Sequence, residues 1–176
     1  GKKRRPHPAR IEAAVAGKTS NETPPRPTPL RYAELHAVSN FSFLRGASHP
    51  DELVERAAAL GYDAFALTDA ASFAGIVRAH VKAKELGLKL IVGAEIALLD
   101  AASVVLLAPD RAAYGRLSRL ITVGRRRAAK GSCELSFADV VAFADGLFAL
   151  VLPDEDALRP FSDAAALARA AARIAP

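Results

Sequence analysis

Short apolar runs alternate with amphipathic stretches from residue 32 onward, and this alternation is the main structural signal of the chain. The run 88–99 is almost continuously apolar, as expected for a strand that is covered on both faces. The longer stretches repeat their apolar positions with helical spacing. The pattern predicts strands over 32–38, 63–69, 88–99, 103–109 and 147–153, and helices over 49–61, 72–87, 110–128, 136–146 and 162–175.

Start and stop signals support the predicted helices. Pro50 suits the first turn of the first helix and Gly61 ends it, Ser72 and Gly87 bound the second, and Ser136 caps the fourth. Strands and helices alternate about five times, which predicts an α/β fold with a mostly parallel sheet. A complete eight-fold barrel needs about 200–250 residues. We therefore expect an incomplete (β/α) barrel.

Residues 1–31 differ in composition from the rest. They hold eight Lys and Arg, two Asp and Glu, and six of the eleven prolines, so the net charge of +5 belongs to this segment. The composition predicts a flexible, disordered basic tail at 1–31, ahead of a domain at 32–176. The alternative to a solvated tail is contact between Lys2-Lys3-Arg4-Arg5 and nucleic acid.

The composition also bears on location. No apolar run is long enough to span a membrane, and no signal-peptide pattern follows the first charges. Cys133 is the single cysteine, which suits a reducing compartment. We expect a cytoplasmic protein with no membrane partner. The chain has no methionine and begins with Gly1, so we expect a processed, engineered or incomplete product.

Three polar residues follow the predicted strands at one edge of the sheet. His36, Asp69 and Glu95 stand near the carboxyl ends of the first three strands, where active residues of parallel α/β folds gather. One imidazole and two carboxylates are suitable ligands for a divalent metal. The alternative is a hydrogen-bonded polar cluster. No nucleophile elbow or phosphate loop is present, and Cys133 has no evident base partner.

The segment "ELHAVSNFSFLRGASHP", with "ALTDA" and "IVGAEI" further on, resembles the PHP (polymerase and histidinol phosphatase) domain that opens the α subunit of bacterial DNA polymerase III. The family frame has a Leu-His-x-His-Ser opening, then Asp-Gly, a Thr-Asp-His turn and a Gly-x-Glu strand end. The stretches "SNFSFLRGASHP" and "RLITVGRRRAAKG" are most similar to the error-prone, damage-inducible members. The resemblance covers residues 32–152 and implies a truncated PHP-type barrel.

Several ligand positions of the family frame have changed. His36, Asp69 and Glu95 match the frame, and the departures are Val38 for the second histidine, Arg45 for the acid before Gly46, Ala70 for the histidine after Asp69, and a lost histidine near Ser103. A metal-dependent phosphoesterase site needs several such ligands to activate water. We therefore expect no tight metal, no cofactor and no hydrolysis. Arg45 is predicted to replace the lost metal electrostatically.

The predicted helix 110–128 is strongly basic. Leu117, Leu120, Ile121 and Tyr114 are predicted to form its buried stripe. Its outer cations are candidates for contact with DNA phosphates or a neighbouring domain, against the alternative of a solvated face. These residues are Arg116, Arg119, Arg125, Arg126 and Arg127.

The resemblance implies a parent enzyme, an error-prone, translesion DNA-directed DNA polymerase that transfers nucleotides with Mg²⁺. Its catalytic carboxylates belong to a region downstream of this domain, so the chain is expected to be an amino-terminal fragment that is inactive by itself and structural. The implied partners are the rest of the polymerase chain, the DNA primer-template and mutagenesis accessory proteins. Two alternatives remain open: a stand-alone PHP phosphoesterase, and a protein-interaction module of a mutagenesis complex.

Overall fold

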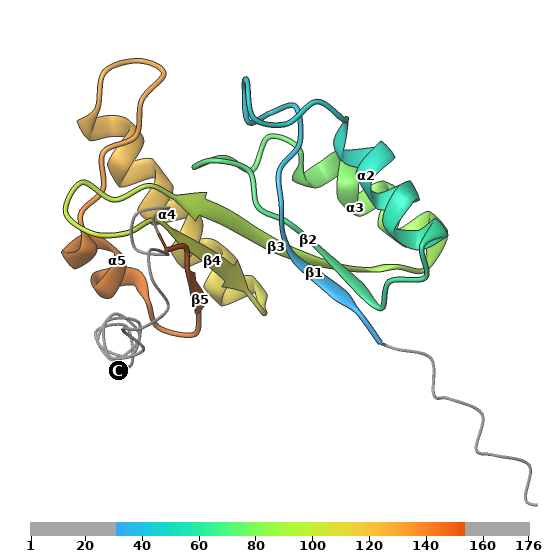
Figure 1. Ribbon diagram of the computed structural model, residues 1–176. Coiled ribbons are helices and arrows are strands. Elements are labelled where there is room, and N and C mark those ends of the chain that lie inside the picture. Colours follow the sequence, from blue (N-terminus) through green and yellow to red (C-terminus); the bar gives the residue numbers. More distant parts are fainter. Residues whose placement is uncertain (1–30, 154–176) are drawn as a thin grey trace, which may run out of the picture. The chain divides into compact units, whose positions relative to one another are not determined.

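Five strands join in sequence order, β1-β2-β3-β4-β5, into one curved sheet in the computed structural model, which describes residues 31–153 (Figure 1). The predicted tail up to residue 30 and the predicted helix 162–175 lie outside the described residues. The elements are β1 (Ala33–Ala37), α2 (Pro50–Ala59), β2 (Ala64–Leu67), α3 (Ile76–Leu86), β3 (Lys89–Ile96), β4 (Val104–Ala108), α4 (Arg111–Arg127), α5 (Phe137–Phe143) and β5 (Phe148–Val151).

The α/β class and the incomplete barrel are confirmed, but the sheet is mixed where a mostly parallel sheet was predicted. The β1–β2 and β2–β3 pairs are parallel, whereas β3–β4 and β4–β5 are antiparallel. The reversal begins after β3 because residues 97–103 are too few to cross back over the sheet, and a short connection can join only antiparallel neighbours.

Local signals fixed most helix ends. Gly87 ends α3 with a φ of 67° in the left-handed region, and the Ser136 hydroxyl accepts a hydrogen bond from the Asp139 amide at the start of α5. The start of α3 was predicted at Ser72 and lies at Ile76. The reason is local, because the Ser72 hydroxyl accepts a hydrogen bond from the Ala74 amide at 3.1 Å and forms a turn in place of a helix cap.

Two apolar clusters hold the helices on the sheet. The first joins α2 and α3 to β2, and its buried members are Val54, Ala57, Phe65, Leu67, Ala79 and Ala83. The second joins α4 and α5 to β3 and β4, and its buried members are Ala94, Ile96, Val104, Leu106, Leu117, Leu120, Leu135 and Val140. Alternate residues of β3, Glu95 among them, point to the opposite face of the sheet. The fold thereby presents Glu95 on the face away from α4.

The buried stripe of α4 differs from the prediction at one position. Leu117 and Leu120 are fully buried and Ile121 packs against the cluster, as predicted. Tyr114 is 39% exposed and stacks on Phe73 with ring centroids 4.9 Å apart. Ala113 takes the buried place because it lies in helical register with Leu117 and Leu120. No helix within residues 31–153 is long and apolar enough to span a membrane.

Candidate functional site

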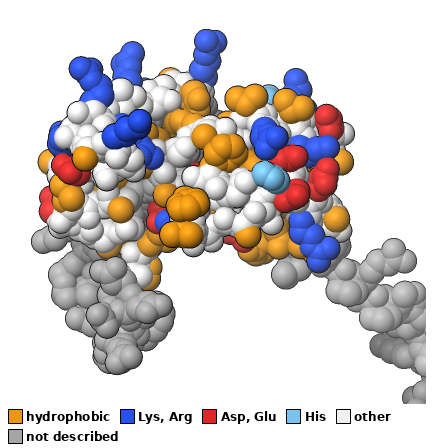
Figure 2. Space-filling model, turned by 90° about the horizontal axis from the view of Figure 1, so that it is seen from above, with side chains coloured by type: hydrophobic (Ala, Val, Ile, Leu, Met, Phe, Trp, Pro, Cys, Tyr) orange, Lys and Arg blue, Asp and Glu red, His pale blue; other side chains and the backbone are white. Residues whose placement is uncertain are grey.

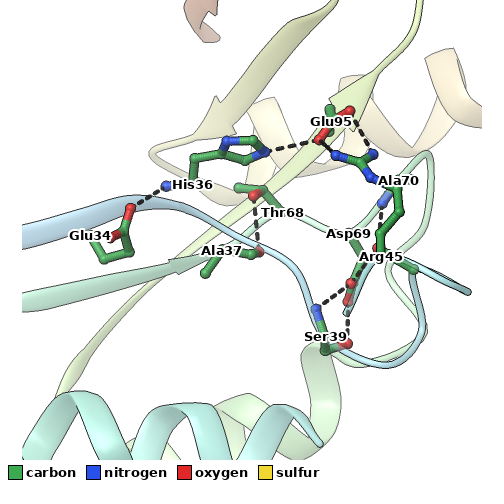
Figure 3. A network of polar contacts seen from close by, with 10 residues as sticks. Glu34, His36, Ala37, Ser39, Arg45, Thr68, Asp69, Ala70 and Glu95 are labelled. Atoms are coloured by element: carbon green, nitrogen blue, oxygen red, sulfur yellow. Dashed lines mark hydrogen bonds and ion pairs between the residues drawn. The ribbon is translucent and has the colours of Figure 1, made fainter. Parts of the chain in front are cut away.

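Three of the predicted site residues meet at the carboxyl end of β1 (Figure 3). Arg45, in the loop after β1, donates two hydrogen bonds to the two carboxylate oxygens of Glu95, from Nη1 at 2.7 Å and from Nη2 at 2.8 Å. His36 Nε2 lies 2.9 Å from Glu95 Oε2 and donates to it, because an ionised carboxylate only accepts. We call Arg45, Glu95 and His36 the arginine cluster.

The backbone of β1 is irregular next to His36, and this irregularity orients the His36 side chain. The register between β1 and β2 shifts between Glu34 and Ala37, which is a bulge-like irregularity of the kind that re-aims a side chain. The carboxylate of Glu34 accepts the backbone amide of His36 at 3.0 Å, so this amide keeps a partner at the irregularity. The local distortion therefore orients the imidazole toward Glu95 without leaving an unsatisfied donor.

The electrostatics of the arginine cluster favour an ionised Glu95. The Glu95 side chain is 9% exposed, whereas that of Arg45 is 46% exposed. Burial alone raises the pKa of Glu95, but the hydrogen bonds from Arg45 and His36 outweigh it and bring the pKa below its ordinary value. The same pair raises the pKa of Arg45 above its ordinary value, chiefly through the hydrogen bond to Glu95. Glu95 is thus a buried anion neutralised by a half-exposed cation.

Asp69 does not join this cluster, although the sequence placed all the polar residues together. Its carboxylate is 1% exposed and accepts the Ser39 amide, the Ser39 hydroxyl and the Ser42 hydroxyl, each at 2.7 Å. Ser42 Oγ also accepts the Ala70 amide at 3.0 Å. The predicted grouping of His36, Asp69 and Glu95 therefore divides into the arginine cluster and a second set, Asp69 with Ser39 and Ser42, which we call the serine cluster.

The sequence reasoning missed the two serines as site residues. Their signal was present in the stretch "SNFS", where two serines three residues apart follow the first strand. A close backbone contact completes the loop: a Cβ added at Gly46 would lie 2.1 Å from the Ser39 carbonyl oxygen. Only glycine fits at position 46, and it sets the position of the neighbouring Arg45.

The donor set does not suit a divalent cation. Within residues 31–153 no group of three His, Cys, Asp or Glu side chains is arranged to hold a metal. Both oxygens of Glu95 face a guanidinium, and the oxygens of Asp69 are taken up by hydroxyl and amide donors. Val38 and Ala70, at two of the positions predicted to lack ligands, supply no ligand atom in their side chains. No metal-dependent step is derived for this site.

A pocket of about 200 Å³ adjoins the arginine cluster. Arg45, Glu95, Arg125 and Cys133 contribute its polar lining. Burial raises the pKa of the Cys133 thiol, which keeps it protonated and poorly nucleophilic. Arg125 forms part of the pocket wall, where it donates hydrogen bonds to the carbonyl oxygens of Ala71 at 3.0 Å and Gly131 at 3.2 Å. The pocket thus presents no nucleophile.

The other basic residues of α4 divide into two kinds. Arg127 donates to both oxygens of Asp139, at 2.6 and 3.0 Å, and Arg116 pairs with Asp145 at 3.4 Å. The Arg127 hydrogen bonds hold the pKa of Asp139 well below its usual range. Arg119 and Arg126 are exposed and make no ion pair or side-chain hydrogen bond with residues 31–153. Of the five predicted contact residues, these two have cationic groups free of internal partners in that range.

Comparisons with known proteins identify relatives of this chain. The PHP domain family matches residues 34–171. An error-prone DNA polymerase of Aromatoleum aromaticum is 57% identical over 77% of this chain and 13% of its own length, and one of Methylococcus capsulatus is 64% identical over 59% and 10%. An amidohydrolase structure from Chromobacterium violaceum, with bound sulfate, is 29% identical over 53% of this chain and 33% of its own, with a TM-score of 0.46.

The chain therefore spans about a tenth of the length of these curated relatives. The family match covers most of the chain and begins at the strand that carries His36. The chain belongs to the PHP domain family, and its sequence relatives there are error-prone DNA polymerases.

Proposed function

We propose that this chain is the PHP portion of an error-prone, DNA-directed DNA polymerase, and that the portion is structural and without hydrolytic activity. The observation that carries the proposal is the bidentate Arg45–Glu95 pair, which places a fixed cation against the carboxylate that a metal would need. The names of the relatives support the parent activity, in which nucleotides are transferred with Mg²⁺ on a primer-template. Lesion bypass, DNA repair and a cytoplasmic location belong to the same proposal.

Metal content separates a structural domain from a stand-alone phosphoesterase. We expect the purified chain, reconstituted with Mn²⁺ or Zn²⁺, to hold less than stoichiometric metal and to turn over no phosphate ester. His36→Ala is the matched control, because metal that stays bound after this change is not held by the arginine cluster. Stoichiometric metal and turnover that both disappear in His36→Ala would contradict the proposal and support the phosphoesterase.

A structural role also predicts how the parent polymerase responds to damage in the arginine cluster. Arg45→Met in the longer polymerase should lower its thermal midpoint and shorten its active lifetime at elevated temperature. The initial rate of primer extension with Mg²⁺ at low temperature should stay the same, because the cluster is not part of the nucleotide-transfer site. A lower initial rate in a fully folded variant would indicate a direct role in catalysis instead.

We propose in addition that Arg119 and Arg126 contact a phosphate backbone without sequence preference. Basic side chains project from the half of the described region that holds α4 (Figure 2). Each phosphate contact contributes about 0.9 to the slope of log affinity against log salt. The double variant Arg119→Ala/Arg126→Ala should therefore reduce the slope for primer-template binding by about 2. Exposed cations of α3, changed in Arg78→Ala/Lys84→Ala, are the control, and an equal loss in both would indicate a general charge effect.

A further inference from the structure

The loop between β1 and α2 exposes two large apolar side chains side by side. Phe43 is 84% and Leu44 90% exposed, and Leu44 is the most exposed large hydrophobic residue within 31–153. We call this pair the loop tip. Figure 2 looks onto the end of the domain where the β1–α2 loop lies, and hydrophobic side chains are prominent across the middle of that face.

The loop tip is held by anchors on both sides. Ser42, immediately before it, donates its hydroxyl to the buried Asp69, and its carbonyl accepts the Arg45 amide at 2.9 Å. Arg45, immediately after it, makes the bidentate pair with Glu95. The residues at the two ends of the tip are therefore fixed to β3 and to the end of β2, while the tip itself has few neighbours.

The backbone of the tip is strained as well. Leu44 has a φ of 63°, in the left-handed region that bulky residues rarely adopt. Such strain persists where the surroundings enforce it, and it is found at clamps and contact sites. A solvent-exposed turn gains nothing from leucine here, since glycine or asparagine adopts this conformation more easily. The strained leucine is explained if its side chain has an apolar contact beyond the described residues.

We propose that the loop tip is a docking anchor, and that Phe43 and Leu44 insert into an apolar pocket on the polymerase portion of the same parent chain. This inference rests on the proposed function. Aromatic side chains such as Phe43 are enriched in the cores of interfaces, and a rigid support lowers the entropy cost of binding for both side chains of the tip. The relatives extend far beyond the matched region, so most of their chain is available to cover this surface.

The charges around the loop tip favour protein over nucleic acid as the occupant. Its neighbouring cation, Arg45, is neutralised by Glu95 and is not free to meet a phosphate. Phe43 alone offers a ring on which a base could stack, and Leu44 beside it is aliphatic. An apolar pair beside a neutralised cation therefore matches an apolar protein pocket.

The direct test is hydroxyl-radical footprinting of the full-length polymerase. Phe43 and Leu44 should be modified about tenfold more slowly than their exposure in this domain implies, because docked anchors are fully desolvated. Val77 of α3, which is 72% exposed, is the internal reference and should react as an exposed residue. Reaction of Phe43 and Leu44 at rates typical of exposed side chains, relative to Val77, would overturn the proposal.

Further measurements identify which molecule covers the loop tip. Protection that appears only with primer-template indicates DNA, protection that grows with protein concentration indicates a second copy, and either result overturns the proposal. The variant Phe43→Ser/Leu44→Ser should increase the rate of proteolytic cleavage between the domain and the polymerase portion about tenfold, whereas Val77→Ser should not. Primer extension by the wild type is measured in parallel. Its absence refutes the proposed function, whereas extension without protection refutes the docking anchor alone.

Discussion

Replacing Arg45 with methionine leaves Glu95 as a nearly buried carboxylate with a single partner, His36. Removing one member of a fully buried pair destabilises a protein by about 3–5 kcal/mol. Arg45 is 46% exposed, so water already weakens the pair, and His36 still donates one hydrogen bond to Glu95. We therefore expect Arg45→Met to lower the free energy of unfolding by about 2 kcal/mol, within the range for hydrogen bonds to charged groups.

Urea denaturation of the wild type and three variants isolates the interaction. Wild type, Arg45→Met, Glu95→Gln and the double variant form a thermodynamic cycle, and we expect a coupling energy of about 1–2 kcal/mol for two residues in direct contact. Arg45→Met alone should shift the midpoint by about 1 M. A coupling energy below about 0.5 kcal/mol would show that the guanidinium and the carboxylate contribute independently, and the interpretation of Arg45 as the replacement for a metal would be wrong.

The pH dependence provides a second check on the same pair. The folded-state pKa of Glu95 is lowered, so its contribution to stability is complete above its ordinary pKa of 4.5 and is lost as the pH falls through the folded-state pKa. The difference in unfolding free energy between wild type and Arg45→Met should therefore be constant near neutral pH and shrink in acid, where Glu95 takes up a proton first in the variant and at lower pH in the wild type. A difference that persists in acid would point to lost packing of the arginine side chain.

Three further predictions concern other residues. Gly46→Ala should lower the thermal midpoint, since its Cβ would lie 2.1 Å from a carbonyl oxygen, whereas Gly115→Ala on α4, where a Cβ meets nothing, should stabilise by about 0.5–1 kcal/mol. Ser42→Ala should cost about 1–3 kcal/mol in urea denaturation because it removes a hydrogen bond to a buried carboxylate. Arg127→Gln should bring the pKa of Asp139 back toward its ordinary value in an NMR titration, and no change would refute the role of Arg127.

Local patterns in the sequence were sufficient for most of the fold. The strands and helices were predicted close to their observed positions because apolar periodicity and residues such as Gly87 and Ser136 act within a few positions of the chain. The reversal of strand direction after β3 was missed, because alternation alone does not show whether a connection crosses the sheet. Tyr114 was predicted in the buried stripe of α4, but the adjacent Ala113 is buried there, because helical spacing alone does not distinguish two neighbouring positions.

The site was predictable in its members but not in its pairing. The resemblance to PHP domains pointed to His36, Arg45 and Glu95, which contact one another. It also grouped Asp69 with them. In the structure the Asp69 carboxylate accepts a hydrogen bond from the hydroxyl of Ser42, 27 residues earlier in the chain, and is not part of the arginine cluster. Such long-range hydrogen bonds depend on the loop conformation that Gly46 permits, and sequence spacing contains no measure of that conformation.

The bidentate Arg45–Glu95 pair restricts which single substitutions the site would tolerate. Changing Arg45 alone to the aspartate of the family frame would bring a second carboxylate beside the buried Glu95 before the remaining metal ligands exist, and like charges at that distance repel. A histidine introduced at position 38 or 70 would add no ligand that a metal could use while the guanidinium remains. Single changes toward a metal site at these three positions would therefore give either a less stable protein or no additional ligand that a metal could use.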